Sequence, residues 1–400
     1  MNLNNLNKFD FWSLDPYGLD DYLSEQYKAY TKRLIEEIAQ YQFDSQINAS
    51  RYERSPFRLS QRNGYSRPRH LSTTHGDITF KLPVARHAVI RYTFLEKFQR
   101  HSHELEYSLL RHVAYGNSYN SVSKLFSGVA SPAKISNLMK KIDYEIIEYR
   151  MRKIEKEYFA LFLDGVWFNL STSRAVALLV IGVDSTGKKE ILDYEVSLKG
   201  ENVETWNRLL SRIYGRGLTS PKIIIRDRKA GLSDSLELIY PSVPQQNCII
   251  HIMRNISSRL ENIVNRYDFC QDLSTLFHVE SIHAYNEKFL DFKKKWSEKE
   301  PKAINYLENY VDSNTFTYLK FNPNIRKLIY TNNHIERFIG DLRANLKHIR
   351  VFPDFISLER FIFLQIYKYN LKEKKVKAEY IPEIKKYFEK KAIITSVLPS

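Results

Sequence analysis

The stretch Phe159-Ala160-Leu161-Phe162-Leu163-Asp164-Gly165-Val166-Trp167-Phe168 is an apolar run that contains a single carboxylate. A short apolar run of this kind is typical of a strand that is covered on both faces of a sheet. Two more apolar segments follow closely, at residues 175–184 and 191–198, and the turn Ser185-Thr186-Gly187 stands between them. The pattern therefore predicts three strands that follow one another in a meander.

Helices and strands alternate after this meander. Residues 202–214 and 232–240 are predicted as helices, whereas residues 221–227 and 246–251 are predicted as strands. A meander followed by helix, strand, helix and strand predicts an α/β fold with a mixed sheet and helices on its faces, the ribonuclease H-like fold. In this arrangement the first and fourth strands lie side by side.

The composition indicates the kind of partner. Of the 400 residues, 61 are Lys or Arg and 46 are Asp or Glu, which gives a formal net charge of +15. A hydrophobic fraction of 43% is enough for packed cores and excludes a disordered chain. A strongly basic folded protein most often binds a polyanion, and nucleic acid is the commonest one. The alternative is a generic basic protein whose charge is set by its host.

The cysteines and the apolar runs bear on location. Cys248 and Cys270 are too few for a disulfide scaffold, and they suit a reducing compartment. The amino terminus lacks the pattern of a signal peptide, and no apolar run approaches the ~20 residues that cross a bilayer. We therefore expect a cytoplasmic protein without a membrane partner, which associates with the nucleoid through DNA.

A basic region precedes the predicted core. Residues 51–111 contain twelve Lys or Arg and five Asp or Glu, and Arg62, Arg67 and Arg69 lie near the Asn63-Gly64 turn signal. Residues 73–83 alternate like a strand of a hairpin. A basic β element with interleaved aromatic residues suits contacts to a DNA backbone, although an ordinary solvated face would have the same pattern.

Residues 104–150 are predicted to be helical, and residues 116–138 resemble a helix-turn-helix. Ser118 and Ser131 are candidate helix caps, and Pro132 is placed where a helix begins. The second helix would then present three polar side chains to a DNA groove, and an ordinary helical hairpin is the alternative. These three residues are Lys134, Asn137 and Lys141.

The regions follow one another in a predicted order. They are an N-terminal helical segment (1–50, with an amphipathic helix at 17–43), a basic DNA-binding region with helix-turn-helix-like helices (51–157), the first part of the core (158–255), a helical insertion (256–326), the final part of the core (327–372) and a Lys-rich tail (373–400).

Two aspartates lie where a ligand would bind. Asp164 interrupts a buried strand, and Asp227 stands at the carboxyl end of another, where ligands of open α/β sheets gather. Two neighbouring carboxylates repel each other unless a cation lies between them, and Mg²⁺ is the expected oxygen-seeking ion. Asp184 and Asp193, which also follow apolar residues, are predicted to form turns.

Glu336 is the third acidic candidate, at the start of a helix that begins near Thr331. The spacing Asn333-x-x-Glu336 is also that of a capping box, in which Asn333 caps the helix and Glu336 is its third residue. The spacing alone leaves both roles open.

Four ordered motifs resemble those of Mutator-type transposases of bacteria and archaea. The similarity runs through residues 60–370 and includes Arg62-Asn63-Gly64-Tyr65 and Gly116-Asn117-Ser118. The four motifs are Phe162-Leu163-Asp164-Gly165, residues 225–232 (IRDRKAGL), residues 244–255 (PQQNCIIHIMRN) and residues 325–337 (IRKLIYTNNHIER). Arg228 after the second aspartate and Asn332 before Asn333 depart from the usual pattern, but neither removes a metal-binding oxygen.

The resemblance implies a function and a site. Asp164, Asp227 and Glu336 would be the catalytic triad and would hold two Mg²⁺ ions, for which Mn²⁺ could substitute. The enzyme would cut double-stranded DNA at terminal inverted repeats and join the freed 3′-hydroxyl to target DNA. Bringing two ends together requires a homodimer or a larger assembly. His251 and Arg254 would contact a phosphate or the acidic site.

Other features have competing interpretations. Cys248-x-x-His251 is half of a zinc site without a second half, so core packing of Cys248 is favoured. Trp206 could stack on a base, but its helical spacing favours the core. A DNA-binding regulator that has lost catalysis, and a stand-alone metal-dependent nuclease of the same fold, are the alternative functions. Intact acids argue against the first, and the helical insertion with the basic N-terminal region argues against the second.

Overall fold

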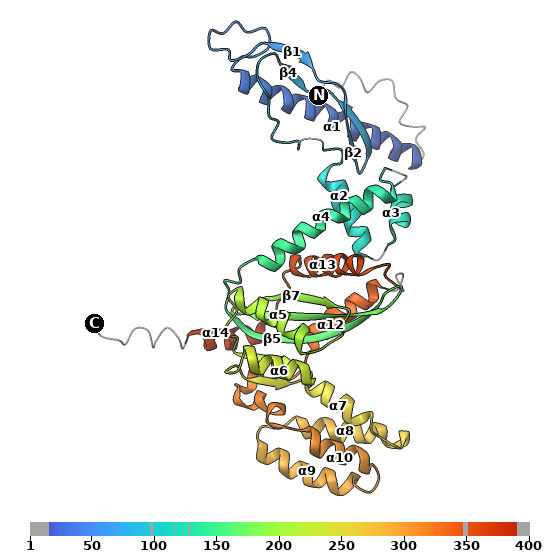
Figure 1. The fold of residues 1–400 in the computed structure, drawn as a ribbon, viewed down its shortest axis with the longest axis vertical. Helices are drawn as coiled ribbons and strands as arrows, with labels where there is room; N and C mark the ends of the chain where they lie inside the picture. Colours follow the sequence, from blue (N-terminus) through green and yellow to red (C-terminus); the bar gives the residue numbers. More distant parts are fainter. Residues whose placement is uncertain (1–15, 97–98, 116, 127–128, 347–350, 390–400) are drawn as a thin grey trace, which may run out of the picture. The chain divides into compact units, whose positions relative to one another are not determined.

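The structure is a computed structural model that describes residues 16–96, 99–115, 117–126, 129–346 and 351–389 (Figure 1). The chain divides into two compact units, Met1–Lys140 and Lys141–Ser400. Residues 1–15 of the predicted N-terminal segment, Gly116 of the predicted helix-turn-helix and residues 390–400 of the predicted tail lie outside the described residues. Within the described ranges, no helix has both the length and the apolar character that crossing a membrane requires.

The first unit is built on one long helix, α1 (Pro16–Ile47), which confirms the predicted helix. The apolar face expected for it is wrong, because the residues whose spacing predicted it are exposed, namely Leu23, Tyr27, Tyr30, Leu34, Ile38 and Tyr41. Ile35, Ala39, Phe43 and Ile47 recur every fourth residue and form its buried face. This face packs on two antiparallel strand pairs. The pairs are β1 (Arg62–Tyr65) with β4 (Pro83–Ala85), and β2 (Arg69–Thr73) with β3 (Gly76–Phe80).

The turn of the predicted hairpin lies at residues 74–75, between β2 and β3. The interpretation of Asn63-Gly64 as a turn is wrong, because both residues lie inside β1. The pairing of β1 with β4 shifts register between Arg62 and Tyr65, and Gly64 has a φ of 71° there. Glycine supplies the left-handed backbone that such a bulge uses.

Three helices follow, and two of the predicted caps are confirmed. They are α2 (His103–Ala114), α3 (Tyr119–Leu125) and α4 (Pro132–Met151). The hydroxyl of Ser118 accepts a hydrogen bond from the backbone N–H of Ser121, and that of Ser131 accepts one from Lys134. Pro132 is the first residue of α4, as predicted. The division between the two units falls within α4.

The second unit contains a mixed five-stranded sheet with the order β7-β6-β5-β8-β9. β5, β6 and β7 form the predicted antiparallel meander, whereas β8 and β9 run parallel to β5. The prediction that the first and fourth strands are neighbours is confirmed. The strands are β5 (Tyr158–Asn169), β6 (Arg174–Asp184), β7 (Lys189–Ser197), β8 (Ile223–Arg226) and β9 (Gln245–Asn247).

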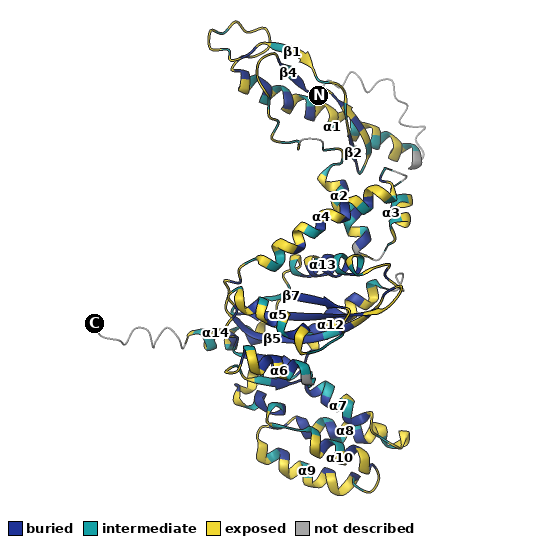
Figure 2. Ribbon diagram, viewed as in Figure 1, coloured by how far each residue is buried: buried dark blue, intermediate teal, exposed yellow. Residues whose placement is uncertain are grey.

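Helices cover both faces of this sheet, whose residues are almost all buried (Figure 2). On one face, Trp206 and Leu209 of α5 (Val203–Gly215) and Leu232 of α6 (Ala230–Ile239) pack on alternate residues of β5 and β6. On the other face, α12 (Asn333–Asn345) contacts β5 and β6, and α13 (Phe355–Leu371) contacts β7. Trp206 is fully buried, which confirms its predicted place in the core.

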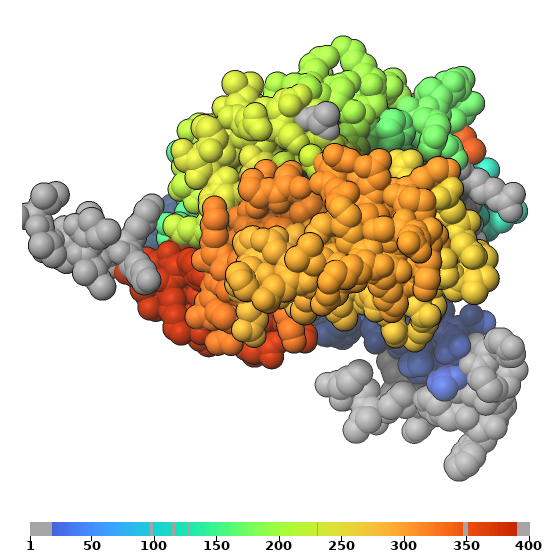
Figure 3. Space-filling view, turned by 90° about the horizontal axis from the view of Figure 1, so that it is seen from below, coloured from blue at the N-terminus to red at the C-terminus, as the bar shows by residue number. Residues whose placement is uncertain are grey.

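The region between the second aspartate and Glu336, which is predicted as a helical insertion, consists mainly of helices. It has its own core around Phe269, Phe292 and Trp296, and its surface is orange in Figure 3. The helices of this region are α7 (Ile249–Ser257), α8 (Arg266–Phe277), α9 (Ile282–Trp296), α10 (Pro301–Tyr310) and α11 (Pro323–Ile329).

Two predicted segments differ from the structure. The fifth strand ends at Asn247 rather than residue 251, because Ile249, Ile252 and Ile256 have the spacing of one buried helix face in α7. The Lys-rich segment after residue 373 is not only a tail. It contains α14 (Ile381–Glu389), whose Ile384 is fully buried.

Gly231 allows α6 to approach the beginning of α5. A Cβ atom on Gly231 would lie 2.8 Å from the backbone nitrogen of Val203. We expect Gly231→Ala to lower the free energy of unfolding by about 1–3 kcal/mol, because backbone atoms cannot move aside like a flexible side chain. Urea unfolding measures this. Gly215→Ala is the matched control, since a Cβ atom there meets nothing within 4 Å, and an equal loss in both variants would contradict the explanation.

Candidate active site

Asp164 is buried in the middle of β5, with only 8% of its surface exposed. One of its carboxylate oxygens accepts a hydrogen bond of 2.8 Å from the backbone N–H of Gly165. Burial raises the pKa of this carboxyl, although His251 and Lys229 lie close enough to oppose the shift. Asp164 is therefore a buried acid whose charge is not neutralised by a direct ion pair within the described part of the chain.

Asp227 follows β8 directly, and the strand register places it beside Asp164. Ala160 lies opposite Ile223 and Phe162 opposite Ile225 in the parallel pair β5–β8. Two residues further along each strand come Asp164 and Asp227. A carboxylate oxygen of Asp227 accepts a hydrogen bond of 2.7 Å from the backbone N–H of Arg228. The two aspartates therefore stand side by side, Asp164 within the long β5 and Asp227 just beyond the carboxyl end of the short β8.

Glu336 lies in the first turn of α12 and points to the same place, but the predicted capping box is absent. The cap residue is Asn332 rather than Asn333. The side chain of Asn332 does not cap the helix, because its amide nitrogen donates to the carbonyl of Leu163, at 3.0 Å. This bond fixes the start of α12 against β5, one residue before Asp164. The Glu336 side chain therefore takes no part in a capping box and instead contacts His251 and Arg254 of α7.

His251 lies between two of the acids. Its Nε2 atom is 3.1 Å from Oε1 of Glu336, and its Nδ1 atom is 3.6 Å from Oδ1 of Asp227. Burial lowers the pKa of this imidazole, but its hydrogen bond to Glu336 and the nearby aspartates outweigh burial and raise it. The same hydrogen bond lowers the pKa of Glu336. The prediction that His251 stands at a strand end is wrong, since it is on α7.

Arg254 and Lys229 add positive charge to the acids. Arg254 is one turn after His251. Its Nη1 and Nη2 atoms donate to Oε1 and Oε2 of Glu336, respectively, each at 3.2 Å. Its side chain stays 61% exposed, so it stands at the mouth of the site. Lys229 is 3.9 Å from Asp227 and is held by Glu201 at 2.7 Å. The sequence pattern does not indicate Lys229 or Glu201, because their closeness to the acids depends on the packing of α5 and α6.

The structure also bears on the zinc interpretation. Cys248, His251 and Glu336 are the group of possible metal ligands found together in the described ranges. However, burial raises the pKa of the Cys248 thiol to about 11, and its sulfur accepts a hydrogen bond from the backbone N–H of Asn332. A cysteine binds zinc as the thiolate, which a raised pKa disfavours. The fully buried Cys248 therefore packs in the core, as the sequence favours.

The DNA-contact candidates have different surroundings. Arg62 forms an ion pair with Asp44 and lies over the ring of Phe43. Arg69 is half-buried and donates to the carbonyl of Glu96. The remaining candidates of the first unit and α4 are exposed, namely Arg67, Lys134, Asn137 and Lys141.

In metal-free buffer, we expect Asp164→Asn to raise the free energy of unfolding increasingly as the pH rises. The pKa of Asp164 is raised in the folded protein, so the stability that its proton contributes is complete below the unfolded pKa of about 4. It is lost as the pH rises through the folded pKa. Asparagine carries no charge. Urea unfolding in EDTA at about pH 4 and about pH 7 measures the difference, and an equal gain at both pH values would contradict this cause.

Comparison with known sequences identifies the relatives of this chain. Residues 17–373 match the family described as Transposase, Mutator family. The chain belongs to the Mutator family of transposases.

Individual Mutator-family transposases are similar over most of their length. The chain is 24% identical over 358 residues to the transposase for insertion sequence element IS905 of Lactococcus lactis, covering 88% of this chain and 90% of that protein. It is 27% identical over 373 residues to the transposase for insertion sequence element IS256 in transposon Tn4001 of Staphylococcus aureus, covering 89% and 92%. It is 27% identical over 315 residues to the transposase for insertion sequence element IS1201 of Lactobacillus helveticus, covering 76% and 83%.

Proposed function

We propose that this protein is an insertion-sequence transposase that cuts and joins DNA with Asp164, Asp227 and Glu336 as its catalytic acids. The observation that carries the proposal is that Glu336 of α12 and Asp227 at the end of β8 both lie against His251, while Asp164 of β5 is near enough to interact electrostatically with His251 and Asp227. The three acids lie far apart in the sequence but are all near His251. The strand order, with helices on both faces, also supports a ribonuclease H-like fold.

Not every buried acid of the sheet is a candidate. Asp193 is fully buried, and its carboxylate is paired with Arg212 at 2.8 Å and with Arg216 at 2.7 Å. Asp164 has no such arginine pair, which leaves it available for a ligand. Asp193 therefore has a structural role, whereas Asp164 fits a site that is completed by a cation.

The donor set fits Mg²⁺ or Mn²⁺. Asp164, Asp227 and Glu336 would supply hard carboxylate oxygens, which these ions prefer. A buried acid with a raised pKa and the Nδ1 atom of His251, which has no hydrogen-bond partner, are features that suit a cation-binding site. Two bound ions would activate the attacking oxygen and stabilise the leaving oxygen of a phosphodiester.

The protein groups around the acids have separate tasks in this proposal. His251 holds the Glu336 carboxylate by its Nε2 atom, and Asn332 holds the helix of Glu336 against β5. Arg254, exposed at the mouth, would bind a DNA phosphate. In the reaction, water breaks a phosphodiester at the element end and leaves a 3′-hydroxyl. That hydroxyl then displaces a 3′-oxygen of target DNA, so the number of phosphodiesters is conserved in the joining step.

The proposed partner is double-stranded DNA, at both the terminal inverted repeats and the target. The net charge of +15 and the exposed Arg67, Lys134 and Asn137 suit contacts to the DNA backbone and grooves. Joining two ends implies a homodimer or a larger assembly, and the partner implies a cytoplasmic, nucleoid-associated protein.

Labelled DNA ends from the regions that flank the coding sequence test this function. The purified protein is incubated with them in EDTA, Mg²⁺ or Mn²⁺, and the products are resolved on denaturing gels. We expect nicked ends and joined products in both metals and neither in EDTA. Cleavage without joining would instead indicate a nuclease, and binding without cleavage would indicate a regulator.

A further inference from the structure

A groove leads away from the acidic cluster along the helical insertion. One hollow lies between α7 and α8, and its lining includes Met253, Arg254 and Ser257 of α7. A second, wider hollow extends along α8 to Ile263 and Val264. Arg266 and Cys270 line both hollows, so the two adjoin each other along α8. The groove therefore begins at Arg254, which contacts Glu336, and ends in the loop before α8.

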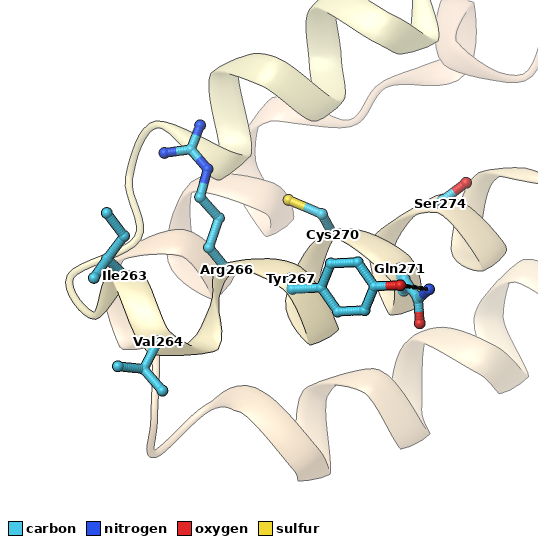
Figure 4. Close-up of a pocket in the computed structure, with 7 residues that line it drawn as sticks. All are labelled: Ile263, Val264, Arg266, Tyr267, Cys270, Gln271 and Ser274. Atoms are coloured by element: carbon cyan, nitrogen blue, oxygen red, sulfur yellow. Dashed lines mark hydrogen bonds between the residues drawn. The ribbon is translucent and has the colours of Figure 1, made fainter.

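Helical spacing explains why the two walls face each other. The α7 wall consists of residues spaced by three and four, which form one face of a helix, and the α8 wall likewise recurs every fourth residue. The adjoining face of α8 is buried in the core of the insertion through Phe269 and Leu273. The Cys270 sulfur lies 3.2 Å from the Ser257 hydroxyl and joins the walls. Figure 4 shows Arg266 and Cys270 on the same side of α8.

The chemistry of the lining is unusual for a protein surface. Ile263, Val264 and Tyr267 are 80%, 81% and 71% exposed, although apolar side chains of this size are usually covered. Arg266 is exposed and forms no ion pair within the described part of the chain. Neither hollow has a carboxylate among its described lining residues. Apolar and aromatic surface beside the exposed guanidinium groups of Arg254 and Arg266 suits bases that stack and phosphates that need a cation.

We propose that this groove binds a short unpaired segment of the DNA strand next to the phosphodiester at the acidic cluster. Arg254 and Arg266 bind its phosphates, and Tyr267, Ile263 and Val264 contact its bases. Paired DNA keeps its bases stacked inside the duplex, so its outer surface offers no base faces to Tyr267. The continuity of the groove with Arg254, and its lack of carboxylates, favour a nucleic-acid strand over a second copy of the chain. The inference rests on the proposed function, because it takes the acidic cluster as the cutting site.

Binding of oligothymidylate and of a fully paired duplex, measured by fluorescence anisotropy in EDTA, tests the groove without catalysis. We expect Tyr267→Ala to weaken oligothymidylate binding roughly tenfold, as for the loss of one stacking contact, and Tyr267→Phe to retain it. Arg266→Ala should reduce the salt slope of single-strand binding by about 0.7, the value for one lost phosphate contact. Duplex binding should change little in each variant. Leu290→Ala and Lys294→Ala, at exposed positions of α9 away from the groove, are the matched controls.

Cys270 provides an independent measurement in the unaltered chain. It is half-buried in the groove, whereas Cys248 is fully buried and serves as an internal reference. Oligothymidylate should slow alkylation of Cys270 by iodoacetamide, as followed by mass spectrometry, and a duplex should not. Equal protection by both DNAs, or none, would overturn the inference. Protection without DNA that grows with protein concentration would also overturn it and identify a second copy as the occupant.

The two proposals fail in distinguishable ways. If the wild-type protein cuts and joins DNA but Tyr267→Ala and Arg266→Ala bind oligothymidylate normally, the groove assignment is wrong and the proposed function stands. If the groove variants lose single-strand binding but no cleavage occurs in Mg²⁺ or Mn²⁺, the groove stands and the proposed reaction is wrong.

Discussion

Asp164→Asn, Asp227→Asn and Glu336→Gln should each reduce strand cleavage at least about 10³-fold, since the carboxylate that each removes helps to supply several kcal/mol of transition-state stabilisation. Each substitution keeps the size of the side chain but removes the charge that binds a cation. Rates of nicking and joining of labelled DNA ends in Mg²⁺ measure the loss, and circular dichroism verifies the fold.

A matched control shows whether the loss of activity is specific to the three acids or follows from removing any nearby carboxylate. Asp234 is an exposed acid on α6, within a few residues of Asp227 in the sequence. We expect Asp234→Asn to cut and join like the wild type. DNA binding in EDTA should remain in all four variants, because the proposed backbone contacts do not involve these carboxylates. A triad variant that still joins DNA at the wild-type rate would remove that residue from the site.

Asp193→Ala should lower the free energy of unfolding by about 3–5 kcal/mol, because it leaves buried cationic groups without their partner. Arg216 is only 7% exposed in its side chain and loses the carboxylate that lies 2.7 Å away. Arg212 loses two contacts to the same group. Urea unfolding measures the change.

Glu204→Ala is the control for this stability effect. Glu204 pairs with Arg208 on α5, but its side chain is 61% exposed. Exposed pairs contribute at most about 1 kcal/mol. Substitutions at Asp193 and Asp164, both buried in the sheet, should therefore have opposite effects in metal-free buffer, with Asp193→Ala destabilising and Asp164→Asn stabilising at neutral pH. A loss below about 1 kcal/mol for Asp193→Ala would contradict the assigned structural role.

The sequence predicts the parts of the site that depend on local pattern. Asp164 and Asp227 interrupt or end buried strands, and the parallel pairing of β5 with β8 follows from the order of the elements. The placement of His251 failed because Cys248-Ile249-Ile250 is too short a run to distinguish a strand from a helix start. The wider spacing of Ile249, Ile252 and Ile256 carried the helical signal.

Other parts depend on contacts between distant segments. The local spacing suggested a capping box of Asn333 with Glu336. The helix instead begins after Asn332, whose side chain is held by the carbonyl of Leu163, 169 residues away in the sequence. Asp193 was predicted as a turn former, because nothing near it in the sequence indicates burial beside α5. Arg208, Arg212 and Arg216 recur every fourth residue and so form one basic face of a helix. This pattern could have indicated that a buried acid such as Asp193 pairs with them. Asp184, which accepts hydrogen bonds from Thr186 and Lys188, does form its predicted turn.

The hydrogen bond between Asn332 and Leu163 joins an early segment of the chain to a late one, so the site is completed only near the end of synthesis. Domains fold as they leave the ribosome, with the N-terminal parts first. Both aspartates and the whole first unit are synthesised long before Asn332 and Glu336. A nascent chain, or a copy of the gene with an early stop codon, would thus present the basic region to DNA without a complete set of acids. Under the proposed function, such truncated products should occupy the DNA ends without cutting them and so inhibit the full-length protein.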